Sequence, residues 1–239
     1  MPKYENIANT LRDRIRSKKY PPDSFLPNQT DLVKEFDASR MTIKKAINIL
    51  AMEGLVYSQR GSGTKVLNHP FFKKDTSPAN EYEGLSHQMA RRQQSLASQV
   101  IQFDVEFPNE QIQEHLMIQP EQPVYNIQRL RILENEPYIL EHTYMPIHLV
   151  PGLKQEHLLS SIYDYLHQSL NIFFAGAYRT ISADKSTEFD QEYLNCSATD
   201  PILEVQQIVY LKDGQPIEYS TSRNRFDVRS YSILDVQSN

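Results

Sequence analysis

A stripe of apolar residues with helical spacing opens the chain. It follows the i, i+3, i+4, i+7 pattern of one helix face through Tyr4, Ile7, Ala8, Leu11 and Ile15. The pattern predicts an amphipathic helix over residues 3–18, with basic side chains on its other faces. Pro21 and Pro22 follow closely and stop this helix, because proline lacks the amide hydrogen that a helix interior uses.

Two further helices are predicted directly downstream, joined by a turn of residues 37–39. Asn28, with Asp31 three residues on, can cap a short helix that reaches about Phe36. Ser39 can cap the next helix, whose inward positions are Ile43, Ala46, Ile47 and Leu50. Its first turns send outward Arg40, Thr42, Lys44 and Lys45. Two helices joined in this way form a helix-turn-helix, whose second helix enters the major groove of DNA by its cationic N-terminal end.

A hairpin with a glycine-rich tip follows the third predicted helix. Residues 55–58 and 64–67 read as its two strands. Gly61 and Gly63 have no Cβ, so the tip can approach a phosphate or enter the minor groove beside Arg60. A hairpin in this place is the wing of a winged helix. The alternative, a helical core fragment followed by an incidental hairpin, is disfavoured by the order and lengths of the elements together.

Charge is divided unevenly along the chain. Residues 1–70 hold 12 Lys and Arg against 7 Asp and Glu, whereas the rest holds 13 against 23, for an overall net charge of −5. A basic head on an acidic body is typical of a DNA-binding module joined to a domain with another task. We find no membrane-spanning run, no signal-peptide core and only one cysteine, Cys196. We therefore expect a reduced, cytoplasmic protein without a membrane partner.

The head resembles the N-terminal signature of the GntR family of winged-helix regulators. The resemblance is carried by residues 26–66, LPNQTDLVKEFDASRMTIKKAINILAMEGLVYSQRGSGTKV. It implies that DNA is contacted by Gln29, Thr30, Ser39, Arg40, Thr42, Lys44, Gln59, Arg60, Gly61 and Gly63. The chain departs from the family where Asn28-Gln29-Thr30 replaces Ser-Glu-Arg and where Lys44 replaces Arg. Because an Arg fork that reads guanine is lost at both places, the resemblance does not give the operator sequence.

Residues 68–84 have no sustained hydrophobic period and contain two prolines, which predicts a linker. The linker would join a DNA-binding head, residues 1–67, to a body, residues 85–239. Strand signals dominate the body, and the first is an apolar–polar alternation over residues 99–107.

The body contains an internal repeat at an offset of 78 residues. Residues 114–139 align with residues 192–219, and matched pairs include Leu116 with Leu194, Pro123 with Pro201, Gln128 with Gln206 and Leu133 with Leu211. Each copy reads as a helix end, a strand, a tight turn and a second strand. Two such units predict an antiparallel sheet with pseudo-twofold symmetry and helices on one side. The whole chain is therefore expected to be α+β: a winged helix-turn-helix followed by this sheet domain.

The two copies differ in charge on one strand. Arg129 and Arg131 alternate onto an apolar face in the first copy, where the second copy has uncharged side chains. Two guanidiniums among apolar neighbours require an anion, either a carboxylate of the protein or a phosphate or carboxylate of a ligand. Glu141 and Glu218, in the return strands, are candidate partners for the arginines. They could equally accept hydroxyls of a polar ligand.

Residues 84–236 resemble the effector-binding (UTRA) domain of the HutC subfamily, whose fold resembles chorismate lyase. The resemblance is carried by the R-x-R strand, the hairpin turn and the Pro-x-x-x-Glu pieces in order. In members that sense phosphorylated sugars, the R-x-R arginines and an S-x-Y helix start hold the phosphate. The implied effector contacts are Ser86, Arg129, Arg131, Glu141, Ser161, Tyr163 and Glu218. Ser161 could also serve simply as a helix N-cap. The chain has Asn224-Arg225-Phe226-Asp227 where members often show Tyr-Arg-Gly-Asp, so the sugar stays unnamed.

These features together predict a homodimeric transcription repressor that binds an inverted-repeat operator in double-stranded DNA. A small anionic effector in the body, a phosphorylated sugar, would control its operator affinity. Two other interpretations stay open: an enzyme like chorismate lyase, and a DNA-binding dimer with no effector. We find no Ser/His/Asp spacing and no glycine-rich phosphate loop. His142 and His148 flank a predicted strand end, where lone surface histidines are more common than metal ligands. No catalytic residue, metal site or cofactor is therefore predicted.

Overall fold

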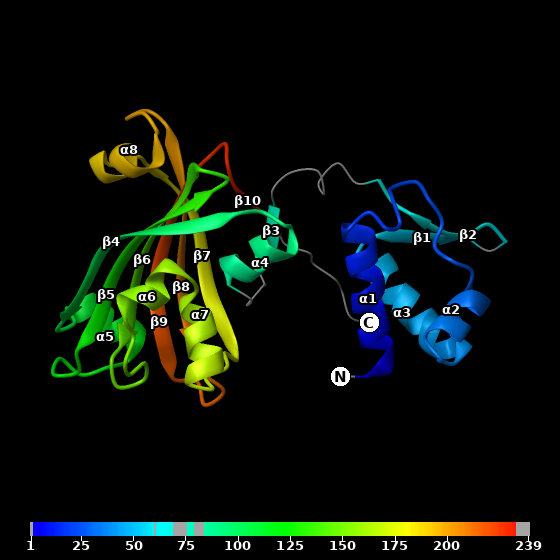
Figure 1. The fold of residues 1–239 in the computed structure, drawn as a ribbon, viewed down its shortest axis with the longest axis horizontal. Helices are drawn as coiled ribbons and strands as arrows, with labels where there is room; N and C mark the ends of the chain where they lie inside the picture. The colour runs from blue at the N-terminus through cyan, green and yellow to red at the C-terminus, as the bar shows by residue number, and fades with distance from the viewer. Residues whose placement is uncertain (1, 60, 69–75, 79–83, 233–239) are drawn as a thin grey trace. The chain divides into compact units, whose positions relative to one another are not determined.

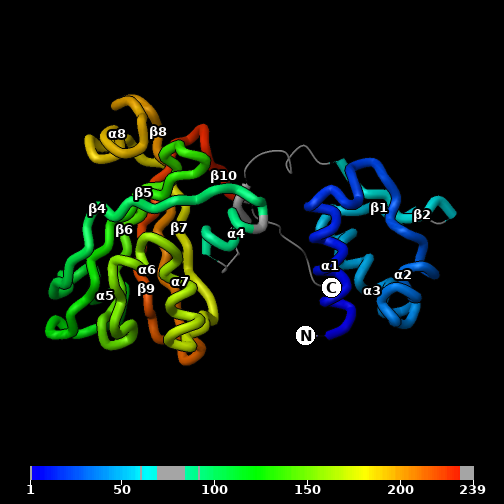
Figure 2. The backbone as a smooth tube through the Cα atoms, viewed as in Figure 1, coloured from blue at the N-terminus to red at the C-terminus, as the bar shows by residue number. Residues whose placement is uncertain are grey.

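The structure, a computed structural model, describes residues 2–59, 61–68, 76–78 and 84–232 (Figures 1 and 2). The chain divides into two compact units, with boundaries between Thr76 and Ser77 and between Tyr231 and Ser232. No described helix is both long enough and apolar enough to cross a membrane.

The first unit is built from three helices followed by a two-stranded antiparallel hairpin, as the sequence predicted. The helices and strands are α1 (Lys3–Arg16), α2 (Gln29–Glu35), α3 (Arg40–Met52), β1 (Val56–Gln59) and β2 (Gly63–Val66). Helix α1 ends two residues before the predicted position. Lys18 adopts a φ of 59°, in the left-handed region, where a right-handed helix cannot continue.

Side-chain caps fix where the second and third helices begin. The side chain of Asn28 accepts a hydrogen bond from the amide of Asp31 at 2.9 Å, and Ser39 accepts one from the amide of Thr42 at 3.1 Å. Both caps were predicted. The inward faces of the helices meet in one core whose buried members include Ile7, Leu11, Leu32, Ile43, Ala46, Ile47, Leu50 and Val66.

The second unit contains a six-stranded antiparallel sheet in the order β4-β5-β6-β9-β8-β7 (Figure 1). Its strands are β4 (Leu96–Glu106), β5 (Val124–Leu133), β6 (Glu136–Pro146), β7 (Gly176–Lys185), β8 (Pro201–Tyr210) and β9 (Pro216–Arg225). From one edge to the centre the strands run β4, β5, β6, and from the other edge to the centre they run β7, β8, β9, in the same sequence order. The predicted pseudo-twofold symmetry is therefore confirmed, with its axis between β6 and β9.

The repeat extends to the helices that precede the hairpins. Helices α5 (Glu110–Leu116) and α8 (Glu188–Leu194) begin and end 78 residues apart. Each ends on a left-handed residue, Met117 with a φ of 52° and Asn195 with a φ of 53°. The offset found in the sequence thus applies to the capping geometry as well as to the apolar positions.

The prediction that the helices lie on one side of the sheet is wrong, because they pack on both faces. Helices α6 (Gln155–Leu159) and α7 (Ile162–Asp164) and the π-helix η2 (Tyr165–Ser169) pack on the face that carries Tyr125 and Ile127 of β5. Helices α5 and α8 pack on the opposite face, in clusters that include Val124 and Leu130 respectively. Strand β5 is buried along almost its whole length, so both of its faces need cover.

Two strand features depart from simple patterns. Strand β4 has a bulge between Val100 and Gln102, so Val100 and Phe103 join the same core although they are three residues apart. Within the predicted linker, β3 (Thr76–Pro78) pairs with β10 (Ser230–Ser232) near the end of the described chain. A three-residue strand is too short to be recognised by periodicity. Helix α4 (Leu85–Arg91) follows the linker.

Candidate functional site

The N-terminal end of α3 carries the exposed cations of the first unit that were predicted to meet DNA. Arg40 and Lys44 are exposed, and neither forms an ion pair within the described part of the chain. The Thr42 hydroxyl lies 2.8 Å from the Ser39 hydroxyl, which itself caps the helix. This end of α3 therefore presents positive charge and hydroxyl groups where the helix dipole also favours anions.

Other cations of the first unit are used internally. Arg12 on α1 donates to Glu53, the C-cap of α3, at 2.7 Å, and Arg14 pairs with Glu35 at 2.5 Å. These pairs fasten α1 to the ends of α3 and α2. The charges of Arg12 and Arg14 are thus neutralised within the unit, unlike those of Arg40 and Lys44.

The remaining predicted DNA contacts lie on two neighbouring elements. Gln29 and Thr30 open α2 and are exposed. Gln59, Gly61 and Gly63 are exposed on the wing, and the two glycines have φ of 84° and 93°. Because L residues rarely adopt such angles, the turn requires glycine at both places. Arg60 lies outside the described residues.

Sequence reasoning missed one exposed side chain among the predicted contacts. Met41 is 63% exposed and stands between Arg40 and Thr42 on α3. An apolar side chain in this position can contact a thymine methyl group in the major groove. The sequence already indicated that Met41 is exposed, because it does not belong to the apolar positions of α3 that face the core.

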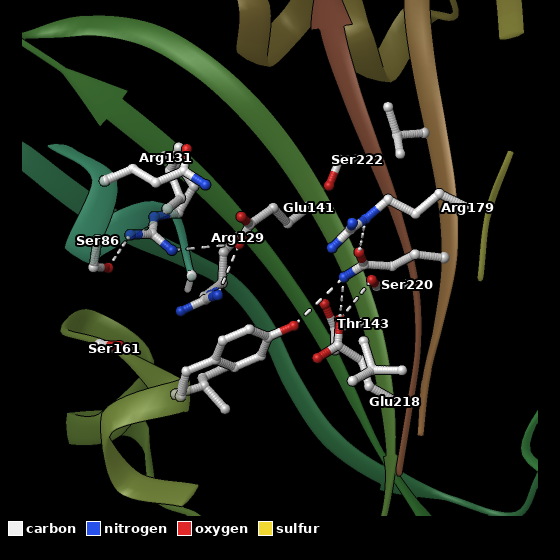
Figure 3. A pocket seen from close by; sticks show the side chains of 18 of the residues that line it. Ser86, Arg129, Arg131, Glu141, Thr143, Ser161, Arg179, Glu218, Ser220 and Ser222 are labelled. Carbon is white, nitrogen blue, oxygen red and sulfur yellow. Dashed lines mark hydrogen bonds and ion pairs between the residues drawn. The ribbon is translucent and has the colours of Figure 1, made fainter. Parts of the chain in front are cut away.

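A pocket on the second unit brings together all seven residues that were predicted to bind an effector (Figure 3). They are Ser86, Arg129, Arg131, Glu141, Ser161, Tyr163 and Glu218. The cavity within the pocket has a volume of about 130 Å³.

One end of the pocket is cationic. Arg129 and Arg131 are 6% and 4% exposed. Arg129 donates from Nη2 to Glu141 Oε2 at 2.7 Å and from Nη1 to the backbone oxygen of Leu158 at 3.0 Å. Arg131 lies 3.6 Å from the same Glu141 oxygen and donates from Nη2 to the Ser86 hydroxyl at 2.9 Å. Glu141 is thus a partner of both arginines, as one interpretation of the sequence expected.

The charge balance at this end favours a further anion. Burial alone would raise the pKa of Glu141, but the charges of Arg129 and Arg131 hold it below its usual range, so the carboxylate is ionised. One carboxylate is then shared by two guanidiniums. The Nε atoms of both arginines are buried and make no hydrogen bond within the described residues. The cationic end is therefore incompletely neutralised by the described protein groups.

The opposite end of the pocket is polar but carries a different set of contacts. Glu218 Oε1 accepts hydrogen bonds from Gln207 Nε2 at 2.8 Å and from the Ser220 hydroxyl at 2.7 Å. Arg179 donates from Nε to Gln207 Oε1 at 2.9 Å, which fixes the orientation of the amide. The Tyr163 hydroxyl lies 3.5 Å from Gln207 Nε2. Figure 3 shows Arg179, Ser220 and Glu218 across the pocket from Ser86 and Arg131, with Glu141 between them.

Glu218, the other candidate partner, pairs with neither arginine, because the ion pairs of Arg129 and Arg131 within the described chain go to Glu141. Burial raises the pKa of Glu218 although Ser220 and Gln207 donate to it. Burial also raises the pKa of Tyr163 well above its usual value. A weakly acidic carboxyl, an amide and hydroxyls can donate to and accept from the hydroxyl groups of a ligand.

The internal repeat explains why the two ends differ. Strands β6 and β9, which carry Glu141 and Glu218, lie side by side at the symmetry axis. Arg129 of the first copy corresponds to Gln207 of the second. The first copy therefore contributes an ion pair between the cross-strand partners Arg129 and Glu141, and the second contributes a diagonal amide–carboxyl pair, Gln207 with Glu218.

Ser161, a predicted effector contact, and His142, which was not predicted to bind, both make contacts within the described structure. The Ser161 hydroxyl accepts a hydrogen bond from the amide of Asp164 at 3.2 Å, so Ser161 is the N-cap of α7 as well as a pocket residue. His142 Nε2 lies 2.8 Å from Asn126 Oδ1. Among the described residues there is no group of three or more His, Cys, Asp or Glu that could hold a metal ion.

Sequence reasoning missed several pocket residues. Ser220 and Ser222 alternate with Glu218 on β9, so the predicted strand already held the signal for them. Arg179 lies on β7, a strand that was not predicted. Arg229, near the end of the described chain, had no local signal.

Comparison with known proteins places both units among described families. The model of bacterial regulatory proteins, gntR family, matches residues 3–66, and the UTRA domain model matches residues 91–228. The HTH-type transcriptional regulator GmuR of Bacillus subtilis (strain 168) is 44% identical over 95% of this chain and 95% of its own. The mannosyl-D-glycerate transport/metabolism system repressor MngR of Escherichia coli (strain K12) is 30% identical over 97% and 94%.

A solved structure is similar along the full length of the chain. The possible transcriptional regulator YydK from Bacillus subtilis subsp. subtilis str. 168 matches with a TM-score of 0.76 and 26% identity, covering 100% of both chains. The relatives named here are transcription regulators rather than enzymes.

Proposed function

Because the chain belongs to the GntR family of bacterial regulatory proteins and carries a UTRA domain, we propose that it is a repressor controlled by a phosphorylated sugar. It is a DNA-binding transcription regulator and not an enzyme like chorismate lyase. In the proposal, residues 1–67 bind an inverted-repeat operator, residues 68–84 link the parts, and residues 85–239 bind the effector and hold two copies together.

The observation that carries the effector proposal is the sharing of Glu141 by two buried arginines. Arg129 and Arg131 are both charged at physiological pH, whereas Glu141 supplies one negative charge. A phosphate that enters beside Ser86 and Arg131 would add the missing negative charge and accept hydrogen bonds from the guanidinium groups. Charge-assisted bonds of this kind are among the strongest polar contacts in proteins.

The opposite end of the pocket supports a sugar as the rest of the effector. Gln207, Ser220 and the Glu218 carboxyl offer closely spaced donors and acceptors, which suits a ligand with several hydroxyl groups. A relative that is 30% identical is named a repressor of a mannosyl-D-glycerate system, which supports both repression and a carbohydrate-derived effector.

The DNA-binding proposal rests on α3 and the wing. Arg40, Thr42 and Lys44 would enter the major groove from the N-terminal end of α3, and Gly61 and Gly63 would let the wing approach the backbone. One such head makes too few contacts for tight specific binding. A homodimer with two heads on successive major grooves doubles the contacts and requires an operator with twofold symmetry.

The test has a DNA arm and an effector arm. Duplexes that bind the full chain are first selected from a random library at moderate salt, and we expect an inverted repeat. Melting temperatures are then measured with glucose 6-phosphate, mannose 6-phosphate, phosphorylated disaccharides and inorganic phosphate. A ligand that binds the folded pocket raises the melting temperature by mass action.

Two variants make the effector arm specific. Arg131→Met should abolish the rise, whereas Lys185→Met, which removes an exposed cation on β7 outside the pocket, should retain it. If no compound raises the melting temperature while the selected duplex still binds tightly, the protein is a DNA-binding dimer without this effector. If no duplex is preferred over random sequence, the operator proposal is wrong.

A further inference from the structure

The C-terminal segment, defined here as residues 228–232, forms part of the pocket wall. Arg229 and Tyr231 both line the pocket, together with side chains from the sheet and from α4. The segment follows β9 through a turn and contains β10. The resemblance to known families assigned no function to these two residues. Their positions add a fourth guanidinium, after Arg129, Arg131 and Arg179, to a pocket lined by two glutamates.

Aromatic rings hold the Arg229 guanidinium beside the cationic end. Its central carbon lies 4.7 Å from the ring centre of Tyr231 and 5.7 Å from that of Tyr138 on β6. Its charge also contributes to lowering the pKa of Glu141, after the larger contributions of Arg129 and Arg131. Arg229 therefore lies within electrostatic reach of the carboxylate that the other two arginines share.

Packing fixes the first residue of the segment. Val228 packs in an apolar cluster with Leu85 and Met89 of α4 and with Tyr138. Val228 thus anchors the segment through apolar contacts, while Arg229 and Tyr231 line the pocket. A ligand that moves Arg229 would therefore act on a segment that already packs against α4 and Tyr138.

The same segment is paired with the predicted linker. Strand β10 pairs with β3 (Thr76–Pro78), which lies within residues 68–84 between the head and the body in the sequence. A residue of the pocket wall, Tyr231, therefore belongs to a strand whose pairing partner is part of the linker. This strand pair is one of two backbone connections between pocket and linker, because Gly84, the last residue of the linker, also lines the pocket at the start of α4.

We propose that Arg229 and Tyr231 contact the effector and transmit its presence to the linker through the pairing of β10 with β3. The inference rests on the proposed function for the existence of an anionic effector. An anion that contacts Arg229 binds more tightly when the C-terminal segment is in place. By linkage, the bound anion must then stabilise that placement and the strand pair that depends on it.

Hydrogen exchange of the full chain, with inorganic phosphate as the probe, tests this route. In the wild type, millimolar phosphate should raise the melting temperature and slow amide exchange at least about 5-fold in peptides that cover residues 76–78 and 228–232. Arg229→Gln should lose most of the slowing. Arg225→Gln is the matched control, because Arg225 lies three residues before Val228, pairs with Asp227 and does not line the pocket.

A milder variant keeps the test valid if Arg229→Gln folds poorly. Tyr231→Phe keeps the ring beside Arg229 and removes only the hydroxyl. In residues 228–232 it should reduce the phosphate-induced slowing of exchange to about the square root of the wild-type factor or less. If phosphate raises the melting temperature but leaves exchange in both segments unchanged, the inference is overturned and the effector pocket stands. If phosphate has no effect on the melting temperature, the proposed anion site fails and the inference with it.

Discussion

Replacement of Glu141 by glutamine is the sharpest perturbation of the pocket. The carboxylate lies 2.7 Å from Arg129 and 3.6 Å from Arg131, and its side chain is 15% exposed. Glutamine keeps the size of the side chain and one carbonyl oxygen but removes the charge. The variant therefore leaves two buried guanidiniums without a carboxylate partner at that position.

Two estimates give similar magnitudes for the loss. Removal of one partner from a buried ion pair costs about 3–5 kcal/mol. Unit charges about 4 Å apart interact with about 4 kcal/mol at an effective dielectric constant of about 20. We expect Glu141→Gln to lower the free energy of unfolding by about 3–4 kcal/mol, a large part of the roughly 5–15 kcal/mol of a typical domain.

Urea denaturation followed by circular dichroism measures the loss. Glu136→Gln is the matched control on the same strand, because Glu136 is exposed at the turn and should change the stability by less than about 0.5 kcal/mol. Phosphate in place of chloride should restore part of the Glu141→Gln loss. A ligand at about 100 times its dissociation constant restores roughly 2.7 kcal/mol.

Either of two results would show that Glu141 does not neutralise the two arginines as described. The first is a Glu141→Gln variant that is as stable as Glu136→Gln in chloride. The second is a phosphate effect that is no larger in Glu141→Gln than in the wild type, because the variant has the greater uncompensated positive charge.

Three further predictions concern DNA, a helix cap and pH. Arg40→Ala should weaken binding to the selected duplex by about 1–3 kcal/mol and relax its sequence preference. Lys19→Ala, which removes an exposed cation outside α3, should retain that preference. Fluorescence anisotropy with the selected duplex and its base-pair variants measures both effects. Asn28→Ala removes the cap of α2 and should cost about 1 kcal/mol in thermal or urea unfolding, while Asn28→Asp should not. Burial raises the folded pKa of Glu218 above its unfolded value, so the folded chain binds this proton more tightly. The contribution of Glu218 to stability should therefore fall as pH rises from about 4.3 towards the folded pKa, and Glu218→Gln should remove that fall in a pH series of unfolding curves. An unchanged pH slope in Glu218→Gln would contradict the assignment.

The local signals in the sequence located the elements of the head well. Asn28 and Ser39 lie within three residues of the amides that they cap, so a short window contains the whole interaction. The repeat could also be detected from the sequence, because residues that match at an offset of 78 are found by comparing the chain with itself. These predictions depend on interactions near in sequence or on patterns that recur.

The contacts that complete the pocket depend on distant parts of the chain. Arg131 meets Ser86 across 45 residues, and Gln207 meets Tyr163 across 44. No local pattern encodes such distances, so the resemblance to a family was needed to associate these segments. Arg179 was missed because β7 has mostly exposed positions and little apolar alternation. The one-sided arrangement was wrong because β5 carries apolar side chains on both faces, Val124 and Leu130 on one and Tyr125 and Ile127 on the other, and each face needs cover.

The central claim is that an anion in the pocket of the second unit controls DNA binding by the first. Its most direct test is the dissociation constant of the full chain for its selected duplex, measured with and without the sugar phosphate that raises the melting temperature most. We expect the dissociation constant to change about 5- to 150-fold, which corresponds to a coupling free energy of about 1–3 kcal/mol. Equal dissociation constants with the pocket saturated would contradict it.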